Sequence, residues 1–193
     1  MSRFISLQIF TVSRLALAVL FFCLIVFMNP TYAVLIAAII IALASELTDI
    51  YDGHFARKYS LVSTFGKYLD PYIDSLSRLT IYFSLALSGY APIWLPIAMS
   101  YRDISVAYLR IYARESDIVV SARMSGKIKA IVQGVGIFVI LFGILFSPGE
   151  TIIYYIKYGV SFIVLAVTLW SLIDYFTGIR RTIREAGDVP GTR

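Results

Sequence analysis

The sequence predicts an all-α membrane protein, a polytopic helical bundle with six transmembrane helices. Of its 193 residues, 59% are hydrophobic and only 15% are charged, and its mean hydropathy is +0.81. A soluble domain carries about a quarter charged residues. Several apolar segments reach or approach the roughly 20 residues that span a hydrocarbon core. We therefore expect one transmembrane domain over residues 1–184 and a short cytoplasmic tail over residues 185–193.

Helix-ending residues divide the first half of the chain into three apolar segments. Asn29-Pro30 follows the first segment, and a proline disfavours helical conformation in the residue before it. The second segment begins at Thr31, and its last turn is acidic. Ser88-Gly89 closes the third segment. The expected spans are residues 9–28, residues 31–52 with helix continuing to Lys58, and residues 66–87.

The second half of the chain holds three further apolar segments. The fourth begins near Pro92 and carries charged residues within it. A basic connector, residues 123–129, leads into the fifth segment, which ends at Ser147-Pro148-Gly149. A basic tail follows the sixth. The expected spans are residues 92–114, the segment between the connector and Ser147, and residues 152–177.

The charge on the connections predicts how the bundle is oriented. The connections near residues 29–31, 88–92 and 147–151 carry only Glu150, whereas lysine and arginine gather on the opposite set. The basic set comprises Arg3, Arg14, Arg57, Lys58, Lys67, Arg114, Arg123, Lys127, Lys129, Arg180, Arg181 and Arg184. The positive-inside rule places this side, with both termini, in the cytoplasm, so the protein is expected in an inner (cytoplasmic) membrane. The net charge of +5 therefore indicates topology and not a nucleic-acid surface.

Four aspartates lie at the cytoplasmic ends of the second and third spans. Asp49 and Asp52 are three residues apart, and Asp70 and Asp74 are four apart, so each pair shares one face of a helix. An unpaired aspartate at membrane depth costs about 3 kcal/mol on insertion scales. Oxygen ligands suit divalent cations, and Mg²⁺ typically joins a few carboxylates to phosphate groups. We therefore predict a site for one or two divalent cations.

Residues beside the aspartates fit a phosphate-bearing ligand. Gly53 and Ala56 leave one helix face thin, and Arg57 offers a planar fork for phosphate. Gly66, one turn before Asp70, favours close packing of the two acidic helices. The simpler alternative is a solvated loop in which the aspartates pair with nearby arginine and lysine. It does not account for so many specified positions together.

The pattern resembles the signature of a known enzyme family. The segment reads Asp49-Ile-Tyr-Asp52-Gly53-His-Phe-Ala56-Arg57, then eight residues, then Gly66-Lys-Tyr-Leu-Asp70-Pro-Tyr-Ile-Asp74. It is similar to the signature of the CDP-alcohol phosphotransferase family. Residues 11–14, 102–110 and 126–129 and the run Asp174-Tyr175-Phe176 also resemble stretches of its bacterial phosphatidylglycerophosphate synthase branch.

This resemblance implies a six-helix membrane enzyme, usually homodimeric, that transfers a phosphatidyl group from CDP-diacylglycerol to glycerol 3-phosphate and releases CMP. It implies that Asp49, Asp52, Asp70 and Asp74 hold two Mg²⁺ or Mn²⁺ ions. Asp74 is also expected to accept the proton of the attacking hydroxyl. The expected donor-binding residues are Thr11, Gly53, Ala56, Arg57, Ser63 and Gly66.

A second basic group predicts an acceptor that carries its own phosphate. Arg102 and Arg110 are two helical turns apart, so both can face one cavity. Charged residues within a span usually face a bundle interior or water. The expected acceptor-phosphate residues are Arg102, Arg110, Lys127 and Lys129, with Arg110 and Lys127 favoured over plain topological charges.

Departures from the resemblance leave the acceptor open. Ser75 stands where a lysine is expected after Asp74, and Arg78 is one candidate to replace it. Asp103 stands where glutamate is expected. Glu46 is a candidate partner near the site, and His54 is expected to be a bystander. The alternatives are the same chemistry with inositol phosphate, serine or a choline-type alcohol, or a divalent-cation transporter.

Overall fold

The computed structural model describes six α-helices and no strand in the residues that it covers. It describes the backbone of residues 2–58, 64–115, 123–146 and 149–187, and the side chains of residues 13–48, 69–114, 123–146, 149–182 and 184. The helices are α1 (Ser2–Phe27), α2 (Tyr32–Lys58), α3 (Thr64–Leu87), α4 (Trp94–Glu115), α5 (Met124–Phe146) and α6 (Glu150–Gly187). The prediction of an all-helical chain with six helices is confirmed for these residues.

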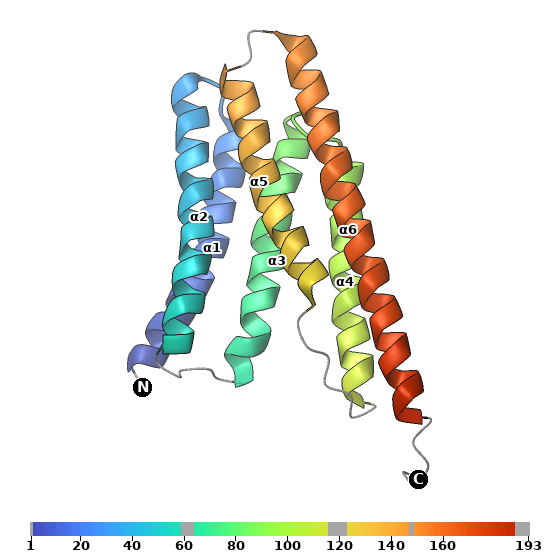
Figure 1. The fold of residues 1–193 in the computed structure, drawn as a ribbon. Coiled ribbons are helices and arrows are strands. Elements are labelled where there is room, and N and C mark those ends of the chain that lie inside the picture. The colour runs from blue at the N-terminus through green and yellow to red at the C-terminus, as the bar shows by residue number, and fades with distance from the viewer. Residues whose placement is uncertain (1, 59–63, 116–122, 147–148, 188–193) are drawn as a thin grey trace.

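The helices run up and down side by side, so both termini lie at the same end of the bundle (Figure 1). The end of α2, the start of α3 and the end of α4 are at that end as well. Helix α1 packs against α2 and α3, whereas α6 packs against α4 and α5. We call the end that holds the termini the basic end.

Local hydrogen bonds explain where α2 begins and α3 ends. The Thr31 side-chain oxygen accepts a hydrogen bond from the backbone N–H of Val34 at 3.4 Å, which caps the start of α2. At the end of α3, Gly89 has a φ of +80°. This left-handed conformation lets the Tyr90 N–H reach the Leu85 carbonyl at 2.7 Å. The turn predicted at Ser88-Gly89 is confirmed.

Three helix boundaries differ by several residues from the expected ones. Helix α1 already starts at Ser2, seven residues before the expected start of the first span. Helix α5 starts at Met124, so most of the segment expected as a basic connector is helical. Helix α6 continues to Gly187, ten residues past the expected end of the sixth span, and the basic tail lies on it. The expectation followed the apolar stretch, but a helix does not have to stop where its sequence becomes charged, because its hydrogen bonds are internal.

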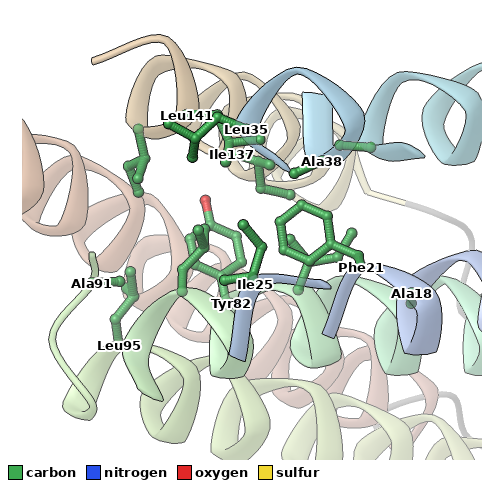
Figure 2. Packing of buried hydrophobic residues seen from close by; sticks show 14 of the residues in the cluster. Ala18, Phe21, Ile25, Leu35, Ala38, Tyr82, Ala91, Leu95, Ile137 and Leu141 are labelled. Carbon is green, nitrogen blue, oxygen red and sulfur yellow. The ribbon is translucent and has the colours of Figure 1, made fainter. Parts of the chain in front are cut away.

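The core lies between all six helices and is built from apolar side chains (Figure 2). Small residues allow close approach, as at Gly136 on α5. A Cβ there would lie 2.7 Å from the Tyr82 hydroxyl and 3.1 Å from Val164, so α3, α5 and α6 meet closely only around a glycine. The buried Tyr82 hydroxyl donates to the Gln133 carbonyl at 2.8 Å.

Two helical segments are long and apolar enough to cross a membrane, namely Met124–Phe146 and Glu150–Thr182. Among the residues with described side chains, Ser13–Phe27 and Tyr32–Thr48 are shorter apolar helical stretches. Large hydrophobic side chains are exposed on several helices, among them Phe27, Ile40, Ile104, Val135 and Phe162. Apolar surface of this extent is typical of a protein that contacts membrane or partner.

Candidate functional site

The four predicted metal ligands occupy the basic end of two helices. Asp49 and Asp52 belong to the last turns of α2, and Asp70 and Asp74 to the first turns of α3. Both helix ends lie at the basic end (Figure 1). The side chains of Asp49 and Asp52 fall outside the described residues. Among the described side chains there is no group of three or more metal-ligating residues, and two of the four aspartates cannot be counted in it.

Asp74 is held by two buried arginines. Its Oδ1 lies 3.2 Å from Arg78 Nη2, one helical turn along α3, and 3.6 Å from Arg14 Nη1 on α1. The side chains of both arginines are less than a tenth exposed, whereas Asp74 is one-third exposed. The carboxylate is therefore held by two groups in the interior of the bundle and remains partly exposed.

Arg78 connects Asp74 to two further helices. Its Nη2 lies 3.2 Å from Oε1 of Glu46 on α2, and its Nη1 donates to the Ala130 carbonyl on α5 at 3.0 Å. A planar guanidinium with several donors can hold such a set of acceptors in fixed positions. Arg78 therefore supplies a positive charge one turn from Asp74, near the position where the family resemblance expected a lysine in place of Ser75.

A small pocket opens beside this cluster. Its wall combines two buried cations, two carboxylates and two hydroxyls; the lining residues are Arg14, Ser45, Glu46, Asp74, Ser77, Arg78 and Ile81. The Ser77 hydroxyl is buried, and no described protein group hydrogen-bonds to it. Because a buried polar atom usually has a partner, this hydroxyl is suited to bind water or a polar ligand in the pocket.

Asp70 and Asp74, the two aspartates whose side chains the structure describes, are suited to bind a divalent cation. The closest contacts of both arginines to Asp74 are with Oδ1, and the Asp74 side chain is one-third exposed. Asp70, one turn earlier on the same face of α3, is exposed. Two carboxylates one turn apart, at a helix end open to water, are a suitable part of an oxygen-ligand site.

The predicted donor-binding residues fall outside the described side chains. The backbones of five of them lie on α1, α2 and α3, and Ser63 belongs to a connection that the structure does not describe. The set is Thr11, Gly53, Ala56, Arg57, Ser63 and Gly66; the bystander His54 and Lys67 lie outside as well. Their roles stay predictions.

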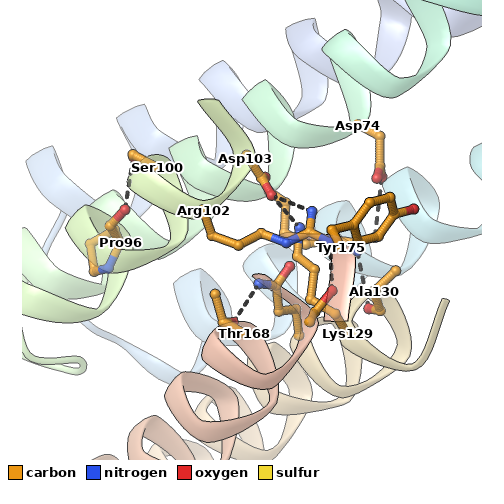
Figure 3. Close-up of polar contacts among 12 residues, drawn as sticks. Asp74, Pro96, Ser100, Arg102, Asp103, Lys129, Ala130, Thr168 and Tyr175 are labelled. Atoms are coloured by element: carbon orange, nitrogen blue, oxygen red, sulfur yellow. Dashed lines mark hydrogen bonds and ion pairs between the residues drawn. The ribbon is translucent and has the colours of Figure 1, made fainter. Parts of the chain in front are cut away.

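The predicted acceptor cations separate into two pairs. Arg102 and Lys129 are buried and share one carboxylate, because Asp103 Oδ1 lies 2.9 Å from Arg102 Nη1 and 2.7 Å from Lys129 Nζ (Figure 3). Arg102 Nη2 also donates to the Ser171 hydroxyl at 2.6 Å. Both charges therefore have an internal partner, and this network joins α4, α5 and α6.

Arg110 and Lys127 are placed differently. Arg110 Nη2 donates to the Tyr175 hydroxyl at 2.7 Å, and no described carboxylate pairs with this guanidinium. Lys127 lies in the first turn of α5 and is exposed. Of the four cations, these two keep the charge that an anionic ligand could meet.

Several contacts of the site had no signal in the sequence. Glu46 and Arg78 are 32 residues apart, and Asp103 and Lys129 are 26 apart, so neither pairing follows from helical periodicity. The Arg78–Asp74 pair did have a signal, because residues at i and i+4 are neighbours on a helix. Tyr175 was visible only as part of the run Asp174-Tyr175-Phe176.

Comparison with known proteins places this site in a family. Residues 7–172 match the model of the CDP-alcohol phosphatidyltransferase family. The chain is 34% identical over 140 residues to a Mycoplasma genitalium protein named CDP-diacylglycerol–glycerol-3-phosphate 3-phosphatidyltransferase, covering 69% of this chain and 59% of that protein. It is 36% identical over 106 residues to a Bacillus subtilis protein of the same name, covering 55% of each.

A third relative matches nearly end to end. The Pectobacterium atrosepticum protein of that name is 31% identical over 180 residues, which cover 91% of this chain and 94% of the relative. By contrast, the chain spans less than two thirds of the length of the Mycoplasma and Bacillus proteins. The family model covers most of the chain and includes both aspartate pairs. The chain therefore belongs to the CDP-alcohol phosphatidyltransferase family.

Proposed function

We propose that the protein is a membrane enzyme of phospholipid synthesis that transfers a phosphatidyl group from CDP-diacylglycerol to glycerol 3-phosphate and releases CMP. The name shared by the relatives supports these substrates, and the Pectobacterium relative supports them over its whole length. The observation that carries the proposal is Asp74, which two buried arginines hold near the basic end while its side chain stays one-third exposed.

Asp74 acts as the general base in this proposal. Arg78 and Arg14 hold the carboxylate in place, and its exposed part takes the proton from the acceptor hydroxyl. The acceptor oxygen forms a bond to the phosphorus that carries the diacylglycerol. The bond from that phosphorus to the bridging oxygen breaks, and CMP leaves with the bond's electron pair. Glu46 keeps Arg78 in place from the other side.

Asp49, Asp52, Asp70 and Asp74 would hold two Mg²⁺ or Mn²⁺ ions. When bound, such ions neutralise the diphosphate and stabilise the attacking and leaving oxygens. The partial exposure of Asp74 and the exposed position of Asp70 support this assignment. The donor's cytidine diphosphate part would contact Thr11, Gly53, Ala56, Arg57, Ser63 and Gly66; of these, Gly53, Ala56, Arg57 and Gly66 lie at the same ends of α2 and α3 as the aspartates.

Arg110 and Lys127 bind the phosphate of the acceptor. Their support is that neither pairs with a described carboxylate, whereas Arg102 and Lys129 share the carboxylate of Asp103. In this proposal Arg102 and Lys129 have a structural role inside the bundle and do not bind the acceptor. A phosphate favours a planar, forked donor such as arginine, which suits glycerol 3-phosphate better than a neutral alcohol.

The bundle crosses a membrane six times, with both termini and the active site on the cytoplasmic side. Exposed apolar side chains on several helices and the concentration of arginine and lysine at the basic end support this orientation. A row of exposed residues on α4, spaced alternately by four and three positions, is typical of a helix-packing seam and supports a homodimer. The row is Ile97, Tyr101, Ile104, Tyr108 and Ile111.

The purified protein in detergent, given CDP-diacylglycerol and a panel of acceptors, should release CMP fastest with glycerol 3-phosphate. The panel should include inositol phosphate, serine and choline, because the aspartate cluster alone does not distinguish them. Faster release with inositol phosphate or a neutral alcohol would keep the chemistry and change the acceptor. Absence of CMP release with every acceptor would contradict the proposed function.

Removal of divalent cations should stop the reaction. Treatment with EDTA is expected to lower CMP release by more than about a hundredfold, because the carboxylates alone repel the diphosphate of the donor. Adding Mg²⁺ or Mn²⁺ in excess should restore the rate. EDTA already saturated with Mg²⁺ is the matched control and should have no effect. Full activity in the metal-free enzyme would disprove the two-metal assignment.

A further inference from the structure

Tyr175 on α6 is a buried residue at which three helices meet. Its side chain is 1% exposed. The hydroxyl accepts hydrogen bonds from Arg110 Nη2 on α4, at 2.7 Å, and from the backbone N–H of Arg123, just before α5, at 3.3 Å. A tyrosine at this position therefore joins the end of α4 to the start of α5.

The ring of Tyr175 also contacts two guanidinium groups. The Cζ atoms of Arg102 and Arg110 lie 5.3 Å and 5.1 Å from the ring centroid. Both distances are within the range of a cation–π interaction. Arg102 is already paired with Asp103. For Arg110, the ring is a stabilising neighbour that does not neutralise the positive charge.

Asp174, the residue before Tyr175, also contacts residues at the start of α5. Asp174 Oδ2 accepts a hydrogen bond from the Ser125 hydroxyl and lies 2.8 Å from Arg123 Nε. On the facing helix, a Cβ added to Gly126 would lie 3.1 Å from the Tyr175 hydroxyl, so the glycine leaves the space that the tyrosine fills. The first turn of α5, which carries Lys127, is therefore docked on Asp174-Tyr175.

We infer that Tyr175 is a positioning residue for acceptor binding, which holds the Arg110 guanidinium in the orientation that receives the acceptor phosphate. This inference rests on the proposed function. Tyr175 touches no reacting atom and acts through Arg110 and, together with Asp174, through the placement of Lys127. It gives the run Asp174-Tyr175-Phe176 a role that the sequence did not indicate.

Physical chemistry supports this assignment. An arginine side chain loses much rotamer freedom when it binds a ligand, so a bond that fixes it beforehand lowers the cost of binding. The Nε of Arg110 is buried and has no partner among the described residues, so the bond to Tyr175 is the contact that directs the guanidinium. A hydroxyl can accept this bond without cancelling the positive charge, whereas a carboxylate would compete with the phosphate.

Replacing Tyr175 with phenylalanine should raise the KM for glycerol 3-phosphate about tenfold, because the ring stays and a hydrogen bond to a charged group is lost. The kcat and the KM for CDP-diacylglycerol should change less than about twofold. Tyr82→Phe is the matched control, since that tyrosine is equally buried and its hydroxyl donates only to a backbone carbonyl. It should leave the KM for both substrates unchanged.

A double-mutant cycle separates positioning from plain stability. Arg110→Ala should raise the acceptor KM more than Tyr175→Phe does, and adding Tyr175→Phe to Arg110→Ala should have no further effect on it. A merely structural tyrosine would instead lower the unfolding temperature and kcat in both backgrounds. Equal effects of Tyr175→Phe with and without Arg110, or an unchanged KM in Tyr175→Phe, would overturn the inference.

A binding measurement distinguishes failure of this inference from failure of the proposed function. Inorganic phosphate should raise the unfolding temperature of the wild-type protein, less so that of Tyr175→Phe, and not that of Arg110→Ala. This readout needs no turnover. If the protein releases no CMP with glycerol 3-phosphate but shows this ranking, the function is wrong and the positioning role stands. An equal phosphate response in wild type and Tyr175→Phe would contradict the role.

Discussion

Replacing Asp74 with asparagine is expected to lower turnover by about 10³- to 10⁴-fold, the range for loss of a general base. Asparagine has nearly the same shape, and its carbonyl oxygen can still accept from Arg78 and Arg14, so the fold should persist. It cannot take a proton from the acceptor hydroxyl. The measurement is CMP release at saturating substrates, together with the shift in unfolding temperature on adding CDP-diacylglycerol.

The donor should still stabilise the Asp74→Asn protein, because Asp74 is one of several groups around the diphosphate. Glu150→Gln is the matched control: this exposed carboxylate begins α6 at the end of the bundle opposite the basic end, so its loss should leave the rate unchanged. If Asp74→Asn retains the wild-type rate, Asp74 is not the base. If it also loses the donor response, Asp74 acts mainly in binding.

The aspartate site could be predicted because its signal is local. Asp70 and Asp74 share a face by helical spacing alone, and the motif names each position. The arginines that hold Asp74 could be predicted only in part. Arg78 is one turn away, whereas Arg14 lies 60 positions earlier on another helix, and only the packing of α1 against α3 brings it to the carboxylate.

The length of α6 shows that an apolar pattern predicts the membrane-spanning part of a helix and not its full length. The helix has 38 residues, which at a rise of 1.5 Å gives about 57 Å, well beyond a hydrocarbon core of about 30 Å. Hydropathy marks the part that can lie in lipid, and the charged remainder can stay helical in water. The part of α6 beyond residue 177 includes Ile179, which packs with Val106 and Ala113 on α4.

The acceptor cations show a limit of the same kind. From the sequence, Arg102, Arg110 and Lys129 were all expected to bind the acceptor phosphate. The structure separates them by one carboxylate, Asp103, which lies next to Arg102 in the chain and meets Lys129 of α5 only in the folded bundle. A buried charge is therefore as often part of the scaffold as part of the site, and only its partners decide which.

Replacing Asp103 with leucine should destabilise the protein by about 3 to 5 kcal/mol, the usual cost of breaking a buried pair by removing one partner. The change leaves Arg102 and Lys129, both less than a tenth exposed, without the carboxylate that pairs with both of them. The measurement is the free energy of unfolding in detergent. The unfolding transition should move to clearly lower temperature or denaturant concentration.

Two further variants test whether the loss of stability comes from leaving buried cations unpaired. Adding Lys129→Met to Asp103→Leu should recover part of the loss, because one of the two unpaired cations is removed and its volume is kept. Asp174→Asn is the comparison: it keeps an oxygen for the Ser125 hydroxyl and removes only the charge that pairs with Arg123 at 2.8 Å, where both side chains are more than a quarter exposed. Because water screens that pair, its removal should cost about 1 kcal/mol or less. An Asp103→Leu protein as stable as the wild type would mean that Arg102 and Lys129 are not held by Asp103, and both would return as candidates for the acceptor phosphate.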